Sequence, residues 1–259
     1  MKRPLVVKIG GAALRDPQVL APVVQGLRQL WERGEHLIVV HGGGPAINQA
    51  LEAAGITWSF IDGLRVTTPE MMTSIQASLW TVNRLVVKAM LAEGLPALGL
   101  DGQDARLLSC EILDARLGQV GKPVHINSEL LLNQSSAITV LSPVGTLADG
   151  SPCNINADMA AAEVAVQCEA NQLYFLTDTR GILDSQGQTL SHVDKDELKL
   201  LEEAGTLKGG MLAKTRAVYR SLTGGVQETF IMHGLDAAHM GSSSIPGTKL
   251  VEATHALTV

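Results

Sequence analysis

The sequence PLVVKIGG at residues 4–11 is a short apolar run that ends in two glycines. A run of this length, rich in β-branched residues, is typical of a strand buried on both faces of a sheet. The dipeptide Asp16-Pro17 follows as an N-cap and a first helical residue, which predicts a helix before Gly34. The pattern then repeats, because HLIVVHGGG at residues 36–44 predicts a second strand and glycine loop before a helix at residues 45–54. Two such units in succession predict parallel strands joined by right-handed crossovers.

The rest of the chain continues this alternation. Further central strands are predicted at residues 97–100, 137–141, 173–177 and 229–232, and shorter, more polar edge strands at residues 57–60, 65–67 and 107–112. Helices are predicted at residues 69–91, 157–168 and 210–222. One face of the first of these helices suits either the core or a subunit contact, and it carries Met72, Ile75, Leu79, Val82, Val86 and Met90. The sequence therefore predicts an α/β fold.

Composition excludes several classes of protein. Hydrophobic residues make up 46% of the 259 residues and aromatic residues only 3%, so aliphatic side chains must fill the interior. The net charge is −6 and Lys and Arg do not cluster, so neither a nucleic acid nor an acidic membrane surface is an expected partner. No stretch approaches the ~18 apolar residues that a membrane span needs. Cys110, Cys153 and Cys168 lack metal-ligand spacing, and we expect reduced thiols in a cytoplasmic protein.

The two glycine clusters are candidate anion sites. Each follows a strand and precedes a helix, where backbone N–H groups can point at a phosphate. Glycines there can also merely close tight turns, but two clusters on adjacent strands favour anion binding. The only Gly-Lys pair, Gly121-Lys122, lacks the other residues of a Walker A loop, and no G-x-G-x-x-G follows a strand. His41-Gly42-Gly43-Gly44 also resembles an esterase oxyanion segment, but no G-x-S-x-G nucleophile accompanies it, so His41 is interpreted as a hydrogen-bonded residue at a strand end.

Charged and amide side chains near glycines narrow the chemistry. Lys8 lies inside an apolar strand, which is costly unless the ammonium meets an anionic partner. Lys214 follows the pair Gly209-Gly210 by one helical turn, and its pattern alone favours an ordinary exposed lysine. Asn156 or Asp158 could cap the helix that follows them. The segment NINAD at residues 154–158 nevertheless holds more amide and carboxylate groups than capping requires.

Ordered motifs from Lys8 to about Gly225 resemble those of the amino-acid kinase family. They are KIGG at residues 8–11, VHGGG at 40–44, DGLRVT at 62–67, GLDGQD at 99–104, NINAD at 154–158, LTD at 176–178, GIL at 181–183 and GGM at 209–211 with Lys214. The first two blocks are shared by many members. The block around Arg65 is more specific, and it is similar to the branch that phosphorylates N-acetyl-L-glutamate.

The resemblance implies a three-layer αβα sandwich around a largely parallel open sheet. An N-terminal lobe, residues 1–168, would bind the acylated amino acid and form a homodimer, and a C-terminal lobe, residues 169–259, would bind ATP. Lys8 and Lys214 would be the catalytic cations, with Asp158 holding both in position. The implied acceptor site is Gly43, Gly44, Arg65 and Asn154, with Arg65 on the α-carboxylate. The implied ATP site is Gly10, Gly11, Asp178, Thr179, Arg180, Gly181, Ile182, Leu183, Thr206, Leu207 and Lys208.

The implied reaction moves the γ-phosphoryl group of ATP to the γ-carboxylate of N-acetyl-L-glutamate, a step of arginine biosynthesis. Mg²⁺ would travel with ATP, and no metal site on the protein is expected. The acceptor carboxylate is ionised at neutral pH, so the reaction requires charge neutralisation and in-line geometry and no general base. This agrees with a motif set of lysines and glycines without an obvious catalytic histidine.

Departures from the family pattern and rival functions remain. Family members often carry a small residue or proline at position 180 and proline at 213, where this chain has Arg180 and Ala213. The segment from residue 232 onward matches poorly. Arginine-inhibited relatives carry an additional N-terminal helix, so we expect a homodimer without arginine feedback inhibition. A kinase for aminoadipate or glutamate tethered to a carrier protein is the nearest alternative, and a regulatory nucleotide-binding protein is a second.

Overall fold

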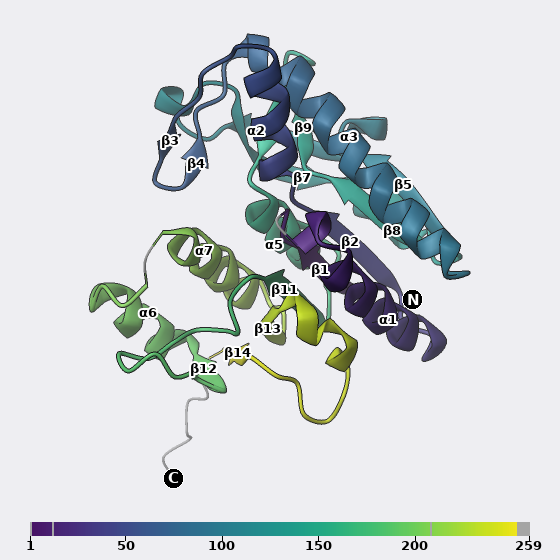
Figure 1. Ribbon diagram of the computed structural model, residues 1–259, viewed down its shortest axis with the longest axis vertical. Coiled ribbons are helices and arrows are strands. Elements are labelled where there is room, and N and C mark those ends of the chain that lie inside the picture. Colours follow the sequence, from purple (N-terminus) through teal and green to yellow (C-terminus); the bar gives the residue numbers. More distant parts are fainter. Residues whose placement is uncertain (1, 12, 208, 253–259) are drawn as a thin grey trace.

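The structure is a computed structural model that describes residues 2–11, 13–207 and 209–252. Within these residues the main sheet has eight strands, flanked by helices on both faces (Figure 1). The spatial order of its strands is β12 (His192–Asp194), β14 (Thr248–Val251), β13 (Glu228–His233), β11 (Gln172–Thr177), β1 (Leu5–Ile9), β2 (Leu37–His41), β8 (Ile138–Ser142) and β5 (Ala97–Asp101). Strands β13 and β14 pair antiparallel and the other neighbours pair parallel. The prediction of an α/β sandwich around a largely parallel sheet is confirmed.

One central strand was misplaced by sequence reasoning. The strand at residues 97–100 was expected inside the sheet, but β5 lies at its edge and leaves Leu98 37% exposed. Its apolar run resembles that of a central strand, and only the tertiary order of strands distinguishes the two. The edge position matters because an unpaired strand offers a surface to a second chain.

The long helices follow the predicted starts closely. They are α1 (Pro17–Glu32), α2 (Gly44–Ala53), α3 (Pro69–Ala92), α5 (Ala157–Gln167) and α7 (Gly210–Thr223), with shorter α4 (Ser128–Leu132) and α6 (Lys195–Glu203). Asp16 caps α1 by accepting a hydrogen bond from the N–H of Gln18 at 2.8 Å. No helix in the described residues combines the length and the apolarity that crossing a membrane requires.

Smaller strands lie outside the main sheet. A closed four-stranded unit is formed by β6 (Leu108–Ile112), β7 (Val120–Ile126), β9 (Val144–Thr146) and β10 (Pro152–Ile155). A hairpin is formed by β3 (Phe60–Ile61) and β4 (Leu64–Arg65). The predicted edge strands at residues 57–60, 65–67 and 107–112 overlap β3, β4 and β6, whereas β7, β9 and β10 had no sequence prediction.

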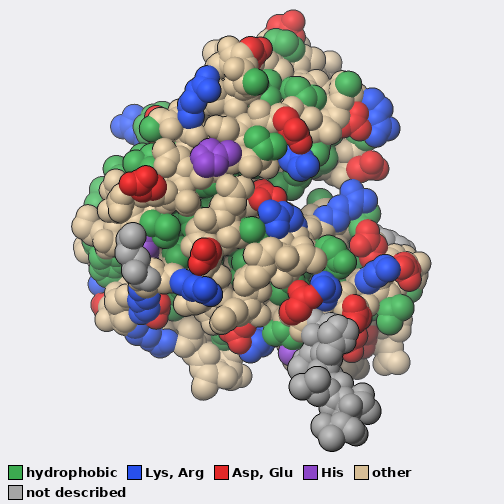
Figure 2. All heavy atoms as spheres, turned by 180° about the vertical axis from the view of Figure 1, so that it is seen from behind, with side chains coloured by type: hydrophobic (Ala, Val, Ile, Leu, Met, Phe, Trp, Pro, Cys, Tyr) green, Lys and Arg blue, Asp and Glu red, His purple; other side chains and the backbone are tan. Residues whose placement is uncertain are grey.

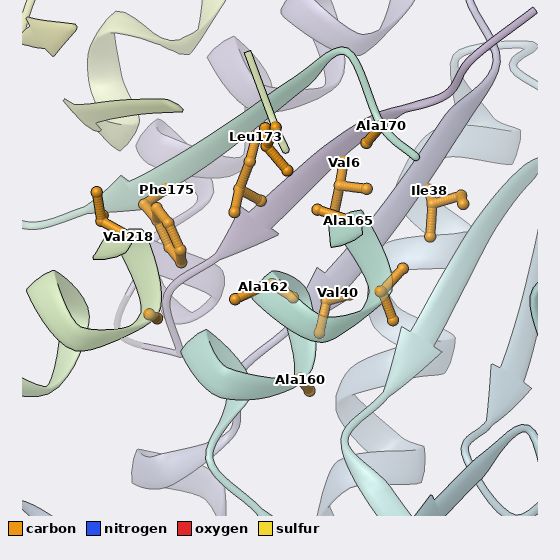
Figure 3. Packing of buried hydrophobic residues seen from close by; sticks show 14 of the residues in the cluster. Val6, Ile38, Val40, Ala160, Ala162, Ala165, Ala170, Leu173, Phe175 and Val218 are labelled. Carbon is orange, nitrogen blue, oxygen red and sulfur yellow. The ribbon is translucent and has the colours of Figure 1, made fainter. Parts of the chain in front are cut away.

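Alternating side chains of the central strands pack into two hydrophobic cores, one on each face of the sheet. Leu5, Val7 and Ile9 of β1 pack on the side of α1 and α3, and Val6 packs on the side of α5. Figure 3 shows this second core, where Val6, Ile38, Val40, Leu173 and Phe175 of the strands meet Ala160, Ala162 and Ala165 of α5 and Val218 of α7. The small alanine side chains let α5 approach the sheet closely, because close-packed interiors leave few voids. Lys8 lies on this same face, which directs it towards α5.

The candidate contact face of α3 is mainly core. Met72, Ile75, Leu79, Val86 and Met90 are buried, and Val82 is half-buried. The opposite face of α3 leaves Trp80 and Leu91 exposed. The sequence left open whether the predicted face served the core or a partner, and the structure assigns it to the core.

Candidate active site

A polar cleft opens at the carboxyl ends of β1 and β2, beside the start of α5. It encloses about 260 Å³. This is the expected ligand position in an open parallel sheet. The cleft is lined by Lys8, Gly11, Gly42, Gly43, Gly44, Pro45, Ile47, Phe60, Gly63, Leu64, Arg65, Leu79, Val120, Pro143, Asn154, Ile155, Asn156, Ala157 and Asp158.

The two glycine loops touch one another across this cleft. A β-carbon placed on Gly11 would lie 3.0 Å from the backbone nitrogen of Gly43 and 3.1 Å from that of Gly44. A side chain at Gly11 would therefore press on both amides. Gly44 also begins α2, so its N–H lies at a helix start, where partial positive charge favours an anion. The two clusters follow β1 and β2, which are adjacent strands as expected, and anion binding by them stays a prediction.

Three charged side chains from distant segments meet at the floor of the cleft. Lys8 Nζ on β1 lies 2.7 Å from Asp158 Oδ1. Lys214 Nζ on α7 donates to both oxygens of the same carboxylate, at 3.1 Å to Oδ1 and 3.0 Å to Oδ2. Each of the three residues is less than a tenth exposed. The structure thus brings together all three residues that the sequence named as catalytic.

Local helix chemistry makes Asp158 available for this cluster. The N-cap of α5 is Asn156, whose side chain accepts hydrogen bonds from the N–H groups of Asp158 at 2.9 Å and Met159 at 3.1 Å. Sequence reasoning left the cap open between Asn156 and Asp158. Because Asn156 takes the cap, the Asp158 carboxylate is free to pair with Lys8 and Lys214.

The interpretation of Lys214 as an exposed helical lysine is wrong. Its side chain is buried, with Nζ 5.3 Å from the centre of the Phe175 ring. The reason is the docking of α7 against α5 and the sheet, which a helical pattern alone does not reveal. Burial next to Asp158 gives the ammonium a charged partner that compensates part of its lost hydration.

The cluster carries an unbalanced positive charge. Burial alone would raise the pKa of Asp158, but the charges and hydrogen bonds of Lys8 and Lys214 outweigh it and hold that pKa at about 2. Burial, followed by the neighbouring charge of Lys8, lowers the pKa of Lys214 to about 8 in spite of Asp158. Two ammonium groups and one carboxylate leave a net charge of about +1 at neutral pH. Such a site can bind and stabilise an anion.

Arg65 is a further cation of the cleft, besides the two lysines. It is 7% exposed, and burial lowers the pKa of its guanidinium. Its Nη2 donates to Asn48 Oδ1, whereas Nη1 is buried and has no hydrogen-bond partner among the described residues. No carboxylate in the described part of the chain lies within ion-pair distance of it. A buried guanidinium with an unused donor is costly unless a ligand oxygen reaches it.

Asn154 lies near Arg65 at the end of β10. Its side-chain amide donates to Thr67 Oγ1 at 3.1 Å, which orients the amide within the cleft wall. The predicted acceptor residues Gly43, Gly44, Arg65 and Asn154 therefore all line the same cleft.

Of the described residues predicted for the nucleotide, Gly11 lines this cleft and the others do not. Residues 178–183 follow β11, which pairs with β1, and do not line the cleft around Arg65. Asp178 and Arg180 are exposed, and Thr179 Oγ1 is buried without a partner among the described residues. Ile182 is fully buried in the core, and its N–H donates to Thr248 Oγ1 at 2.8 Å.

The other residues predicted to bind the nucleotide differ in burial. Gly181 adopts a φ of 139° against Thr248, which disfavours any side chain there. Leu183 is exposed, Leu207 is buried in the core, and the N–H of Thr206 donates to Leu201 O at 3.1 Å. Lys208 lies outside the described residues.

The histidine at the end of β2 is structural, as the sequence indicated. His41 is fully buried, with ring nitrogens 3.0 Å from Gly42 O and 3.2 Å from Ser142 Oγ. Burial lowers its pKa to about 4, so it stays neutral. In the described residues no group of three or more His, Cys, Asp or Glu side chains could hold a metal ion.

Sequence reasoning missed three residues that contact Arg65. They are Asn48 on α2 and the aromatic residues Trp58 and Phe60. One signal was present, because Asp62-Gly63 is a typical two-residue hairpin turn. That turn places Phe60 directly opposite Arg65.

Comparisons with known proteins agree with this geometry. Residues 3–233 match the model of the Amino acid kinase family. The chain is 36% identical over 235 residues to acetylglutamate kinase of Dinoroseobacter shibae, covering 89% of this chain and 81% of the relative. It is 35% identical over 258 residues to acetylglutamate kinase of Shouchella clausii, covering 98% of each.

Solved structures show the same fold. The structure of smu.665 from Streptococcus mutans UA159 superimposes with a TM-score of 0.87 at 26% identity, covering 97% of this chain and 99% of that one. N-acetylglutamate synthase from Neisseria gonorrhoeae, complexed with coenzyme A and N-acetyl-glutamate, superimposes with a TM-score of 0.86 at 22% identity, over 97% of this chain and 60% of that one. At that lower identity the likeness concerns the fold alone.

Proposed function

The chain belongs to the amino acid kinase family, and from this premise we propose that it transfers the γ-phosphoryl group of ATP to the γ-carboxylate of N-acetyl-L-glutamate. The products are ADP and N-acetylglutamyl phosphate. Relatives named acetylglutamate kinase, at about a third identity over most of the chain, support this acceptor. The reaction would serve arginine biosynthesis.

The observation that carries the proposal is the pairing of Lys8 and Lys214 with one buried carboxylate beside two glycine loops. Phosphoryl transfer to a carboxylate brings two anions together and spreads charge over the moving group's oxygens. The compact ammonium groups of Lys8 and Lys214 can stabilise the negative charge of the phosphoryl group during transfer. Asp158 contacts both ammonium groups and offsets their mutual repulsion, so it acts as the positioning residue. The N–H groups of Gly11 and Gly44 add donors without desolvating a further charge.

The opposite end of the cleft suits the amino acid part of the acceptor. Arg65 offers a planar guanidinium whose Nη1 has no partner among the described residues, and a carboxylate is its natural complement. We assign the α-carboxylate to Arg65 and contacts with the rest of the acceptor to Gly43, Gly44 and Asn154. The side-chain carboxylate then points towards Lys8.

The nucleotide site is proposed on the other side of the lysine cluster. The stretches at residues 178–183 and 206–208 would hold ATP, with Gly10 and Gly11 near its phosphates. Mg²⁺ would arrive bound to the nucleotide and neutralise phosphate charge. In this arrangement residues 1–168 carry the acceptor and residues 169–259 carry ATP, and Lys214 reaches the reacting phosphoryl from the second lobe.

We also propose that the protein is a homodimer built on α3 and β5. Trp80 and Leu91 on the outer face of α3 are 41% and 54% exposed, and Leu98 on the edge strand is 37% exposed. Figure 2 shows hydrophobic side chains gathered along this edge of the molecule. A second copy would cover them and pair the free edge of β5. We keep the cytoplasm as the proposed location, because Cys110, Cys153 and Cys168 are free thiols.

A coupled assay of ADP release tests the proposal. The acceptors are N-acetyl-L-glutamate, glutamate, aspartate and acetylated aminoadipate, each with ATP and Mg²⁺. We expect N-acetyl-L-glutamate to be preferred, and turnover of no free acceptor would overturn the substrate in favour of a carrier-linked one. Insensitivity to arginine stays a prediction, which rates measured with and without arginine will test.

A further inference from the structure

The guanidinium of Arg65 lies close to two aromatic rings. Its central carbon lies 4.9 Å from the centre of the Phe60 ring and 5.6 Å from that of the Trp58 ring. Both distances fall within the ~6 Å at which a cation is attracted to an aromatic face. The rings come from the same short segment, and Arg65 itself comes from the facing strand.

The register of the β3–β4 hairpin brings Phe60 and Arg65 together. Phe60 of β3 is the direct cross-strand partner of Arg65 of β4. Directly opposed side chains in an antiparallel pair are close neighbours. The turn residues Asp62 and Gly63, with φ of 50° and 79°, allow the two-residue connection that sets this pairing.

The two rings differ in what supports them. Trp58 packs against the small core cluster that includes Ile47, Leu51 and Leu79, so its ring is tied to the body of the protein. Phe60 is 53% exposed and lines the cleft, so it contributes little to the core. A half-exposed phenylalanine on a four-residue ladder is hard to explain by folding alone.

These contacts leave Nη1 of the guanidinium available to a ligand. The guanidinium carbon lies over the rings of Trp58 and Phe60, and Asn48 accepts from Nη2. Nη1 is left with an unused donor. We propose that Trp58 and Phe60 are positioning residues, which hold the Arg65 guanidinium so that Nη1 meets the α-carboxylate of the acceptor. The inference rests on the proposed function, since it needs an acceptor with such a carboxylate.

The rings act through Arg65 and do not touch the phosphoryl group. Their loss should therefore weaken acceptor binding and leave the rate of phosphoryl transfer at saturation almost unchanged. A looser guanidinium also becomes better hydrated, so it must give up more water when the carboxylate arrives. A cation–π contact in a desolvated site corresponds to roughly a 5- to 30-fold change in affinity.

The decisive experiment is a double-mutant cycle on Phe60 and Arg65. Phe60→Leu, Arg65→Ala and the double variant are compared by calorimetric affinity for N-acetyl-L-glutamate and by kcat and kcat/KM. We expect Phe60→Leu to weaken binding and raise KM about 10-fold with kcat within about 2-fold, and to add nothing in the Arg65→Ala background. Phe60→Tyr keeps the ring and should stay near wild type, as should Ile61→Val on the neighbouring position.

The outcomes separate the two proposals. An unchanged KM in Phe60→Leu, or an equal loss with and without Arg65, overturns the positioning role. If the wild type phosphorylates another carboxylate and not N-acetyl-L-glutamate, the proposed substrate is overturned. The same double-mutant cycle, measured on that carboxylate, then decides the role of the rings. Wild-type protein that neither binds nor phosphorylates any member of the acceptor panel overturns both. Trp58→Leu repeats the test at the ring that packs against the core. Urea unfolding checks that this variant is folded.

Discussion

The ammonium of Lys214 and the carboxylate of Asp158 lie 3.0 Å apart although the two residues are separated by 56 positions in the chain. Lys8 approaches the same carboxylate from β1. A single buried acid thus links the central sheet, the first turn of α5 and the first turns of α7. The position of both cations depends on this one side chain.

Removal of Lys8 should mainly slow the chemical step. Lys8→Ala is expected to lower kcat by on the order of 100-fold or more, because one electrostatic stabiliser of the transferring group is lost. Steady-state kinetics at saturating ATP and acceptor measure this. The control is Lys199→Ala, an exposed lysine on α6 that pairs with Glu203 on the same helix. A Lys8→Ala enzyme with near-normal kcat would show that the phosphoryl assignment is misplaced.

Loss of the Asp158 charge should cost stability as well as activity. Asp158→Asn leaves two buried ammonium groups facing one another, and breaking a buried ion pair costs about 3–5 kcal/mol. Urea unfolding measures the free energy of unfolding, with Glu203→Gln as a surface control. Because the pKa of Asp158 falls from 3.8 to about 2 on folding, its contribution is present above pH 3.8 and is lost as the pH falls towards 2. A variant as stable as the wild type would contradict the paired geometry.

The lowered pKa of Lys214 predicts an alkaline limit of activity. Lys214 is a useful cation only when protonated, and its pKa in the free enzyme is about 8. We expect kcat/KM to fall as the pH rises through this value, since that parameter reports groups of the free enzyme. The alkaline fall of kcat should lie at a higher pH than that of kcat/KM, because a bound phosphate favours the charged ammonium of Lys214. A flat kcat/KM profile up to about pH 9 would be inconsistent with this role.

Arg65 should determine acceptor affinity more than rate. Arg65→Ala is expected to raise the KM for N-acetyl-L-glutamate by roughly 10- to 100-fold with a smaller effect on kcat. Arg65→Lys keeps the charge but loses the planar fork, so its KM should lie in between. If Arg65→Ala lowers kcat and leaves KM unchanged, the guanidinium serves the phosphoryl group and the α-carboxylate assignment is wrong.

The apolar edge formed by α3 and β5 should hold the proposed dimer together. Leu98→Asp places a charge where the edge strands of two copies would meet, and we expect the mass in sedimentation velocity to fall to that of a monomer. The matched control is Leu200→Asp on α6, where an equally apolar side chain is 64% exposed and lies away from this edge. A wild-type chain that sediments as a monomer would remove the basis for the dimer.

The central strands and helices were predictable because their signals are local. A β-branched run ending in glycine and followed by a cap and proline marks β1 and α1 within fewer than twenty residues. The closed unit of β6, β7, β9 and β10 was not predictable in the same way. Pro123 and Pro152 lie within β7 and β10, which weakens a strand signal, and β9 has three residues. Their pairing depends on distant segments.

The site was predictable in composition but not in its supporting contacts. Lys8 was recognisable because a lysine in a buried strand demands an anionic partner. The burial of Lys214 depends on how α7 docks, and helical spacing contains no information on that. The residues around Arg65 follow from the hairpin turn for Phe60, but Asn48 reaches it from another element, which only the tertiary structure shows.

Chemical capture of the acyl phosphate product tests the proposed reaction most directly. Wild-type enzyme is incubated with ATP, Mg²⁺, N-acetyl-L-glutamate and hydroxylamine, which converts an acyl phosphate to a hydroxamate, and the hydroxamate is identified by mass spectrometry. We expect the hydroxamate of the side-chain carboxylate of N-acetyl-L-glutamate, formed in step with ADP. ADP release without any hydroxamate, or a hydroxamate formed only from a different acceptor, would contradict the proposed reaction.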